Sequence, residues 1–155
     1  MYHRPLISST GSPLPSVAAQ SSLLAGEIEA FLVDEAARAV RYHLVLAADV
    51  FVYLNDLAPA IAAIARVLAA DGIVAFTVER NPGNGVKLLP TLRYAHAEAY
   101  LRRTLEAAGL AVAHLAGAAV RSEKGVPVDG LVVVAQPSFA HSRASAMNAP
   151  CERSQ

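Results

Sequence analysis

The sequence predicts an α/β fold, because helical and strand-like patterns alternate along its centre and end in a strand hairpin. The chain has 155 residues, of which 54% are apolar and 17% are charged. A chain of this size and composition can bury a core of its own and is not generally disordered. Both ends are rich in Ser, Pro and Ala without a sustained period. We therefore expect residues 1–22 to be irregular or disordered, residues 23–136 to fold, and residues 137–155 to form a disordered tail.

The first three expected elements are a helix, a strand and a second helix. Apolar residues recur at helical spacing over residues 28–41, which predicts a short amphipathic helix. Residues 44–48 form a continuous apolar run too short for a helix, which predicts a strand buried on both faces, as in a parallel sheet. The second helix is expected to begin with Asn55 or Asp56 as its N-cap and to end at residues 71–72.

A second strand and a third helix follow. Residues 72–78 are again apolar and predict a buried strand, and the Asn, Pro and Gly residues of 81–85 predict a loop. The third helix is expected over about residues 96–108, with Gly109 as its stop. This succession of elements requires helical connections between neighbouring parallel strands.

The last expected element is an antiparallel hairpin. Residues 110–121 and 130–136 have the composition of strands, and residues 122–129 between them lack a helical period. In an α/β sheet of this kind, ligands bind beyond the carboxyl ends of the parallel strands. We therefore expect the functional site at that edge.

The composition excludes several classes of protein. A balance of 13 basic and 13 acidic residues, without a basic cluster, argues against a nucleic-acid partner. Cys151 is the only cysteine, which excludes an internal disulfide, and no His, Asp or Glu spacing predicts a metal site. No window reaches the roughly 20 uncharged apolar residues of a membrane span, and no secretory signal is visible. We expect a cytoplasmic protein with no membrane partner.

One segment resembles a known family closely. Residues 44–57 read LVLAADVFVYLNDL, which resembles the strand-four motif of class I S-adenosylmethionine-dependent methyltransferases. Residues 60–72 resemble the helix and loop that follow in that family, and residues 72–79 resemble its fifth strand. Residues 93–98 and 123–127 resemble a bacterial subgroup often linked to tetratricopeptide repeats. The resemblance covers residues 23–136.

The resemblance implies a partial Rossmann-like methyltransferase sheet with flanking helices. The family has the strand order 3-2-1-4-5-7-6, and this sequence matches strands four to seven, the last two forming an antiparallel hairpin. The Gly-rich loop after strand one and the acidic residue after strand two, which hold the cofactor, have no counterpart in the sequence. The implied function is a truncated S-adenosylmethionine-dependent methyltransferase of doubtful cofactor binding and activity. The alternative is a non-catalytic remnant or interaction module.

The same resemblance implies the cofactor-binding residues Glu27 and Asp49. Glu27 stands where the family places the acid that accepts a hydrogen bond from the adenine amino group, and it could equally be an exposed acid at a helix start. Asp49 ends a buried strand at the expected ligand edge. There it would contact the amino-acid end of the cofactor or the substrate, or cap the next segment.

Four further side chains are candidates for the substrate pocket. Phe51 and Tyr53 flank the end of the same strand, although aromatic residues at alternating positions commonly pack in a core. Tyr94 and His96 are expected in a junction between loop and helix, where His96 could act as a general base or hold the loop in place. The sequence identifies neither the catalytic residue nor the methyl acceptor.

The missing strands also predict an assembly. In the intact family the strand of residues 44–48 is paired on both sides, and here one partner strand is absent from the match. An apolar edge strand without Lys, Pro or a bulge tends to pair with another chain. We therefore expect a homodimer through this edge.

Overall fold

The computed structural model describes residues 27–138, which form one sheet with helices. The predicted irregular ends, residues 1–22 and nearly all of 137–155, lie outside the described residues. The elements follow in this order along the chain: α1 (Ile28–Ala37), β1 (Tyr42–Ala47), the 3-10 helix η1 (Phe51–Tyr53), α2 (Ala58–Val67), β2 (Leu68–Arg80), β3 (Val86–Leu88), β4 (Tyr94–His96), α3 (Glu98–Ala107), β5 (Leu110–Glu123) and β6 (Val126–Pro137).

The four long strands stand in the order β1-β2-β6-β5. β1 is parallel to β2, whereas β6 is antiparallel to both β2 and β5. This is the order 4-5-7-6 that the methyltransferase resemblance predicts for these strands. The predicted α/β class, the parallel pair and the antiparallel terminal hairpin are therefore confirmed.

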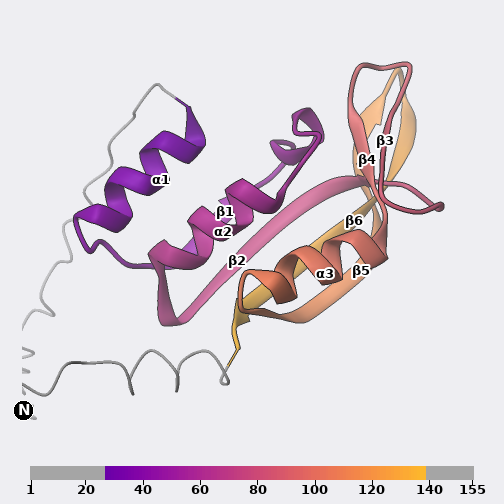
Figure 1. The fold of residues 1–155 in the computed structure, drawn as a ribbon. Helices are drawn as coiled ribbons and strands as arrows, with labels where there is room; N and C mark the ends of the chain where they lie inside the picture. Colours follow the sequence, from indigo (N-terminus) through magenta and orange to yellow (C-terminus); the bar gives the residue numbers. More distant parts are fainter. Residues whose placement is uncertain (1–26, 139–155) are drawn as a thin grey trace, which may run out of the picture.

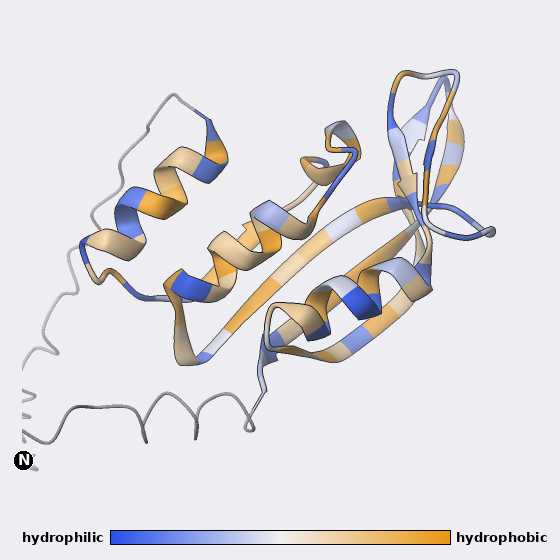
Figure 2. Ribbon diagram, viewed as in Figure 1, coloured by the Kyte–Doolittle hydropathy of each residue, from blue (hydrophilic) through white to orange (hydrophobic). Residues whose placement is uncertain are grey.

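The helices α2 and α3 cover one face of the sheet, and α1 packs against α2 (Figure 1). β2 directs Val74, Phe76 and Val78 into the core beneath them, and all three are buried. Figure 2 shows hydrophobic residues along the central part of β2 and hydrophilic ones in the loop beyond it. Helix amphipathicity and strand alternation thus define a single core between the helices and this face of the sheet.

The opposite face of β1 and β2 carries no helix within residues 27–138. Leu44 and Leu46 of β1 and Ile73 of β2 share this face, and all three are exposed, Leu46 to 69%. The prediction that residues 44–48 are buried on both faces is therefore wrong for the described part of the chain. A continuous apolar run is compatible with burial on both faces, but each face is buried only if another element packs against it.

The junction of α2 and β2 also differs from the prediction. β2 begins at Leu68, directly after the helix, so the expected helix end at residues 71–72 is wrong and these residues belong to the strand. Gly72 is required there, because a Cβ atom would lie 2.6 Å from the carbonyl oxygen of Tyr42. At the other end of α2, the N-cap is Leu57, so the prediction of Asn55 or Asp56 as the N-cap is wrong. The Asp56 carboxylate nevertheless accepts a hydrogen bond from the Ala58 N–H at 3.0 Å.

Two short strands and a tight turn complete the sheet. β4 pairs with the end of β2 and with β3, so the predicted junction at residues 94–96 is a strand and α3 begins only at Glu98. The connection of β5 to β6 is the turn at Lys124 and Gly125, with positive φ angles of 49° and 80°, rather than residues 122–129. Both differences arise from pairing between strands, which a single-segment pattern does not reveal.

Candidate functional site

The carboxyl ends of the parallel strands β1 and β2 meet at one edge of the sheet, where the turn after β1 presents Asp49. Asp49 is exposed and has a positive φ angle of 54°. Its backbone N–H donates to the Thr77 hydroxyl of β2 at 3.0 Å. The turn is therefore tied to the neighbouring strand, and the Asp49 side chain is exposed among residues 27–138.

Tyr53 and Arg93 lie next to each other at this edge. Tyr53 follows β1 in η1, and Arg93 precedes β4. The Arg93 Nη2 group donates to the Tyr53 hydroxyl at 3.3 Å, and the guanidinium carbon lies 5.6 Å from the centre of the Tyr53 ring. The hydrogen bond to Tyr53 is the main cause that raises the pKa of Arg93, and the charge of Asp49 contributes to the same shift.

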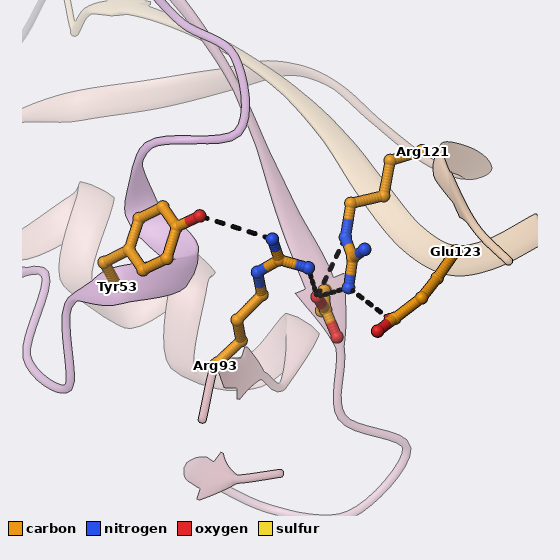
Figure 3. A network of polar contacts seen from close by, with 5 residues as sticks. Tyr53, Arg93, Arg121 and Glu123 are labelled. Carbon is orange, nitrogen blue, oxygen red and sulfur yellow. Dashed lines mark hydrogen bonds and ion pairs between the residues drawn. The ribbon is translucent and has the colours of Figure 1, made fainter. Parts of the chain in front are cut away.

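A buried carboxylate joins this pair to the terminal hairpin. Figure 3 shows the guanidinium groups of Arg93 and Arg121 turned toward one carboxylate, and their ion pairs identify it as Glu79 of β2. Arg121 donates to Glu79 Oε1 from Nη2 at 2.7 Å and from Nε at 3.2 Å, and Arg93 Nη1 lies 4.0 Å from the same oxygen. Arg121 also donates to Glu123 at 3.0 Å. Glu79 can be buried because two cations compensate its charge.

His96 lies beneath this edge in the protein interior. Its Nε2 atom is 3.1 Å from the Leu54 carbonyl oxygen, so Nε2 carries the proton and donates it there. Its other ring nitrogen, Nδ1, is buried and has no hydrogen-bond partner among the described residues. Burial lowers the pKa of His96 below its ordinary value of 6.5. The neutral imidazole therefore fastens the segment after η1 to β4.

The ring of Tyr100 stacks on His96 at a centroid distance of 5.7 Å. The Tyr100 hydroxyl donates to the Asp56 carboxylate at 2.9 Å and accepts from the Leu57 N–H at 2.8 Å. Burial is the main cause that raises the pKa of Tyr100. His96 and Tyr100 together hold the connection between η1 and α2 against β4 and α3.

The remaining predicted site residues lie in different environments. Phe51 is fully buried, and its ring centre lies 5.0 Å from that of Phe76. Tyr94 is half-buried in β4. Glu27 is exposed immediately before α1 and forms no capping hydrogen bond through its side chain. The structure thus places Asp49 and Tyr53 together at the exposed edge and puts Phe51 and His96 in the interior, while their functional roles stay predictions.

Solved structures provide the comparison that defines this architecture. A methyltransferase from Methanosarcina mazei, described as S-adenosylmethionine-dependent, superposes with a TM-score of 0.52 and 14% identity over 63% of this chain. The glycopeptide N-methyltransferase MtfA in complex with S-adenosylmethionine superposes with a TM-score of 0.53 and 15% identity over 75% of this chain. The chain has the class I methyltransferase fold.

A third structure with this fold has two ligands bound. It is the 1,6-didemethyltoxoflavin-N1-methyltransferase of Burkholderia thailandensis with 1,6-didemethyltoxoflavin and S-adenosylhomocysteine, with a TM-score of 0.52 and 18% identity over 64% of this chain. The present chain spans 59%, 64% and 45% of the Methanosarcina, MtfA and Burkholderia chains, respectively. No protein-family model matches the sequence, and no curated protein does.

The described part of this methyltransferase fold fits the cofactor only in part. Asp49 and Glu27 offer exposed carboxylates, which suit the ammonium and amino groups of S-adenosylmethionine. Within residues 27–138, however, no glycine precedes β1, so these residues contain no Gly-rich loop of the kind that approaches a bound cofactor closely. The glycines at 83 and 85 follow β2 and lead into β3 instead of a helix.

Sequence reasoning missed the group formed by Glu79, Arg93 and Arg121. The sequence analysis included Glu79 and Arg93 only as members of segments, residues 72–79 and 93–98, that resemble the methyltransferase family. A usable signal was present, because a carboxylate in a buried strand needs a cationic partner. The sequence does not say which of the 13 basic residues is that partner, since Arg121 is 42 positions away.

The described part of the chain offers neither a metal site nor a membrane-spanning helix. Residues 27–138 contain no group of three or more His, Cys, Asp or Glu side chains arranged to hold a metal ion. None of the helices there has the length and apolar character that crossing a membrane requires.

Proposed function

We propose that this chain supplies the acceptor side of a methyl-transfer site that uses S-adenosylmethionine. The observation that carries the proposal is the exposed Asp49, fastened to Thr77 at the carboxyl end of β1 and next to Tyr53 and Arg93. In an α/β sheet this edge is where ligands bind. The methyltransferase fold of the chain supports the same assignment.

The chemistry requires little from the side chains beyond alignment. When bound, the cofactor supplies an electrophilic methyl group on a sulfonium. A lone pair on the acceptor forms the new bond to the methyl carbon while the bond from carbon to sulfur breaks and sulfur keeps its electrons. Holding the reacting atoms in line accounts for much of such a rate enhancement. In this proposal Asp49 accepts hydrogen bonds from the amino-acid end of the cofactor, Glu27 accepts one from adenine, and Tyr53 faces the acceptor.

We further propose that the 155-residue chain binds S-adenosylmethionine weakly by itself. A Gly-rich turn and a ribose-binding acid would together add several kcal/mol, at roughly 1.5–3 kcal/mol for each hydrogen bond to a charged group. Neither is present in the described residues. Efficient catalysis by the chain alone is not expected, because the unheld cofactor would lose its alignment.

The test is a titration of the 155-residue chain with S-adenosylmethionine. Binding is measured by calorimetry and by the chemical shifts of the backbone amides. We expect shifts around Asp49 and Thr77 only at high micromolar to millimolar ligand. Asp49→Ala should weaken this binding more than His96→Ala does, since Asp49 faces the ligand edge and His96 is buried. Asp71→Ala is the matched control, an exposed acid near the opposite end of β2.

Two results would count against the proposal. A dissociation constant in the low micromolar range would show that the chain forms a complete cofactor site. The absence of any shift at the edge in millimolar S-adenosylmethionine would show that the chain does not take part in cofactor binding.

A second candidate function is that of a non-catalytic interaction module. The observation that favours it is the free edge of β1, which pairs only with β2 among the described residues, together with the exposed Leu44, Leu46 and Ile73. We propose a second copy of the chain as the occupant. Antiparallel pairing of β1 with its two-fold copy would place the two leucines against those of the partner, without opposing like charges.

A further inference from the structure

Arg93 and Arg121 approach the same carboxylate, but they differ in how fully their hydrogen bonds are used. Arg121 donates twice to Glu79 and once to Glu123, and only 14% of its side chain is exposed. Arg93 donates one hydrogen bond of 3.3 Å, to Tyr53, and lies 4.0 Å from Glu79. A guanidinium has five N–H donors. Most of those on Arg93 therefore have no acceptor among residues 27–138.

The side chain of Arg93 is partly exposed near the expected ligand edge. Its side chain is 22% exposed, and it lies against the ring of the exposed Tyr53. Asp49 is near enough that its charge contributes to the pKa of Arg93. Arg93 is thus held beside the turn to which we assign cofactor contact, with part of its guanidinium open.

The charge balance of the cluster explains how Arg93 can stay there without a ligand. The carboxylates of Glu79 and Glu123 offset the two guanidinium charges, so the four side chains together are neutral. An added ligand would therefore be recognised through hydrogen-bond geometry rather than through excess positive charge. The planar fork of a guanidinium matches the two oxygens of a carboxylate.

We propose that Arg93, oriented by Tyr53 and Glu79, binds a carboxylate group on the methyl acceptor. This inference rests on the proposed function, in which the same edge receives the acceptor. Arg93 would fix the acceptor by two parallel hydrogen bonds, and the Tyr53 ring would support an apolar or aromatic part of the same molecule. Asp49 would face the cofactor's ammonium group and would not oppose the acceptor's charge.

The experiment uses the full chain without cofactor and benzoate as the probe, with uncharged benzamide as its isosteric control. The side-chain Nε–H signals of the arginines are followed by NMR. We expect benzoate to shift the Arg93 signal in a saturable way and to leave the Arg102 signal unchanged, because Arg102 lies on α3 and pairs with Glu98. Benzamide should shift neither signal.

Variants of Arg93 distinguish the effect of the guanidinium geometry from that of its charge. Because they lack the Arg93 Nε–H signal, benzoate binding is followed in all chains through the backbone amide signal of Tyr53, which Arg93 contacts. Arg93→Gln should weaken benzoate binding at least about tenfold, the effect of losing a single hydrogen bond to a charged group. Arg93→Lys keeps the charge but loses the fork, and it should also bind more weakly. Arg102→Gln is the matched control and should bind like the unchanged chain. If Arg93→Gln does not fold, Arg93→Lys carries the test.

The outcomes distinguish this inference from the proposed function. Equal shifts with benzoate and benzamide, or unchanged benzoate binding in Arg93→Lys, would overturn the carboxylate site whatever the chain does with S-adenosylmethionine. Benzoate binding that depends on Arg93, in a chain that shows no response to S-adenosylmethionine, would support the anion site and contradict the methyltransferase assignment alone.

Discussion

The two faces of the sheet are formed by the same strands, but one is buried and the other is exposed. On the helix-covered face, Val74 and Phe76 are buried and belong to the core. On the other face, Leu44, Leu46 and Ile73 are just as apolar and remain exposed. Alternation along a strand decides which residues share a face, but the elements that pack against that face decide whether it is buried. Substitutions on the helix-covered face should therefore change the free energy of unfolding, and substitutions on the open face should change self-association.

The largest expected effect is the loss of a core ring on the covered face. Phe76→Ala removes a buried side chain that packs on Phe51 at a centroid distance of 5.0 Å, and it should lower the free energy of unfolding by about 3–5 kcal/mol. Leu46→Ala on the open face should change it by about 0.5 kcal/mol or less. Urea denaturation of both variants, at protein concentrations too low for self-association, measures these free energies of unfolding. Similar losses for the two variants would mean that the open face is covered in the folded chain.

The open face should instead control assembly. We expect light scattering to show a dimer of the chain at micromolar concentration, because β1 offers an apolar edge and two exposed leucines. Leu46→Lys should shift the chain to monomer by placing charges at the pairing surface. Leu92→Lys is the matched control, since Leu92 is 78% exposed but lies in the turn between β3 and β4. A stable monomer of the unchanged chain would mean that the edge is covered from within the chain.

A smaller effect concerns pH and the interior beneath the site. Burial lowers the pKa of His96, so below its ordinary value of 6.5 the unfolded chain gains a proton that the folded chain resists. The stability that neutral His96 contributes should be present above that pH and lost as the pH falls below it. His96→Gln keeps a donor for the Leu54 carbonyl and should flatten the dependence between pH 7 and pH 5 in thermal melts. His43→Gln, which changes an exposed histidine whose Nδ1 atom lies 3.0 Å from the Asp71 carboxylate, is the control. An unchanged pH profile in His96→Gln would contradict this account.

Much of the fold could be predicted because it depends on local patterns. The apolar runs of β1 and β2, the stripe of α2 and the Gly-containing turn before β6 each indicate their own element. The order of the long strands needed more than periodicity, and it came from the resemblance of residues 44–57 to a methyltransferase motif. The exposed position of Asp49 at the end of β1 also agrees with its predicted place in the sheet.

The rest depended on contacts between distant segments. The strand character of residues 94–96 comes from pairing with β2 and β3, and it has no period of its own. The pairing of Glu79 with Arg121 joins two strands that are 42 residues apart, and Arg93 joins them from a third segment. The exposure of Leu46 is a property of what covers the sheet rather than of β1. Such features become visible only when the chain is folded.

The two-residue turn at Lys124 and Gly125 has a consequence for the order of folding. It joins strands of 14 and 12 residues that are adjacent in sequence, whereas β1 and β2 are separated in the chain by η1 and α2. Hairpins of this kind close within microseconds, and more distant pairings close later. We expect β5 and β6 to form the nucleus, on which β2 assembles before β1 adds at the outer edge. This order of folding predicts kinetic φ-values, from the effect of mutations on folding rates, near 1 in the hairpin and near 0 in β1. The reverse pattern would refute this order.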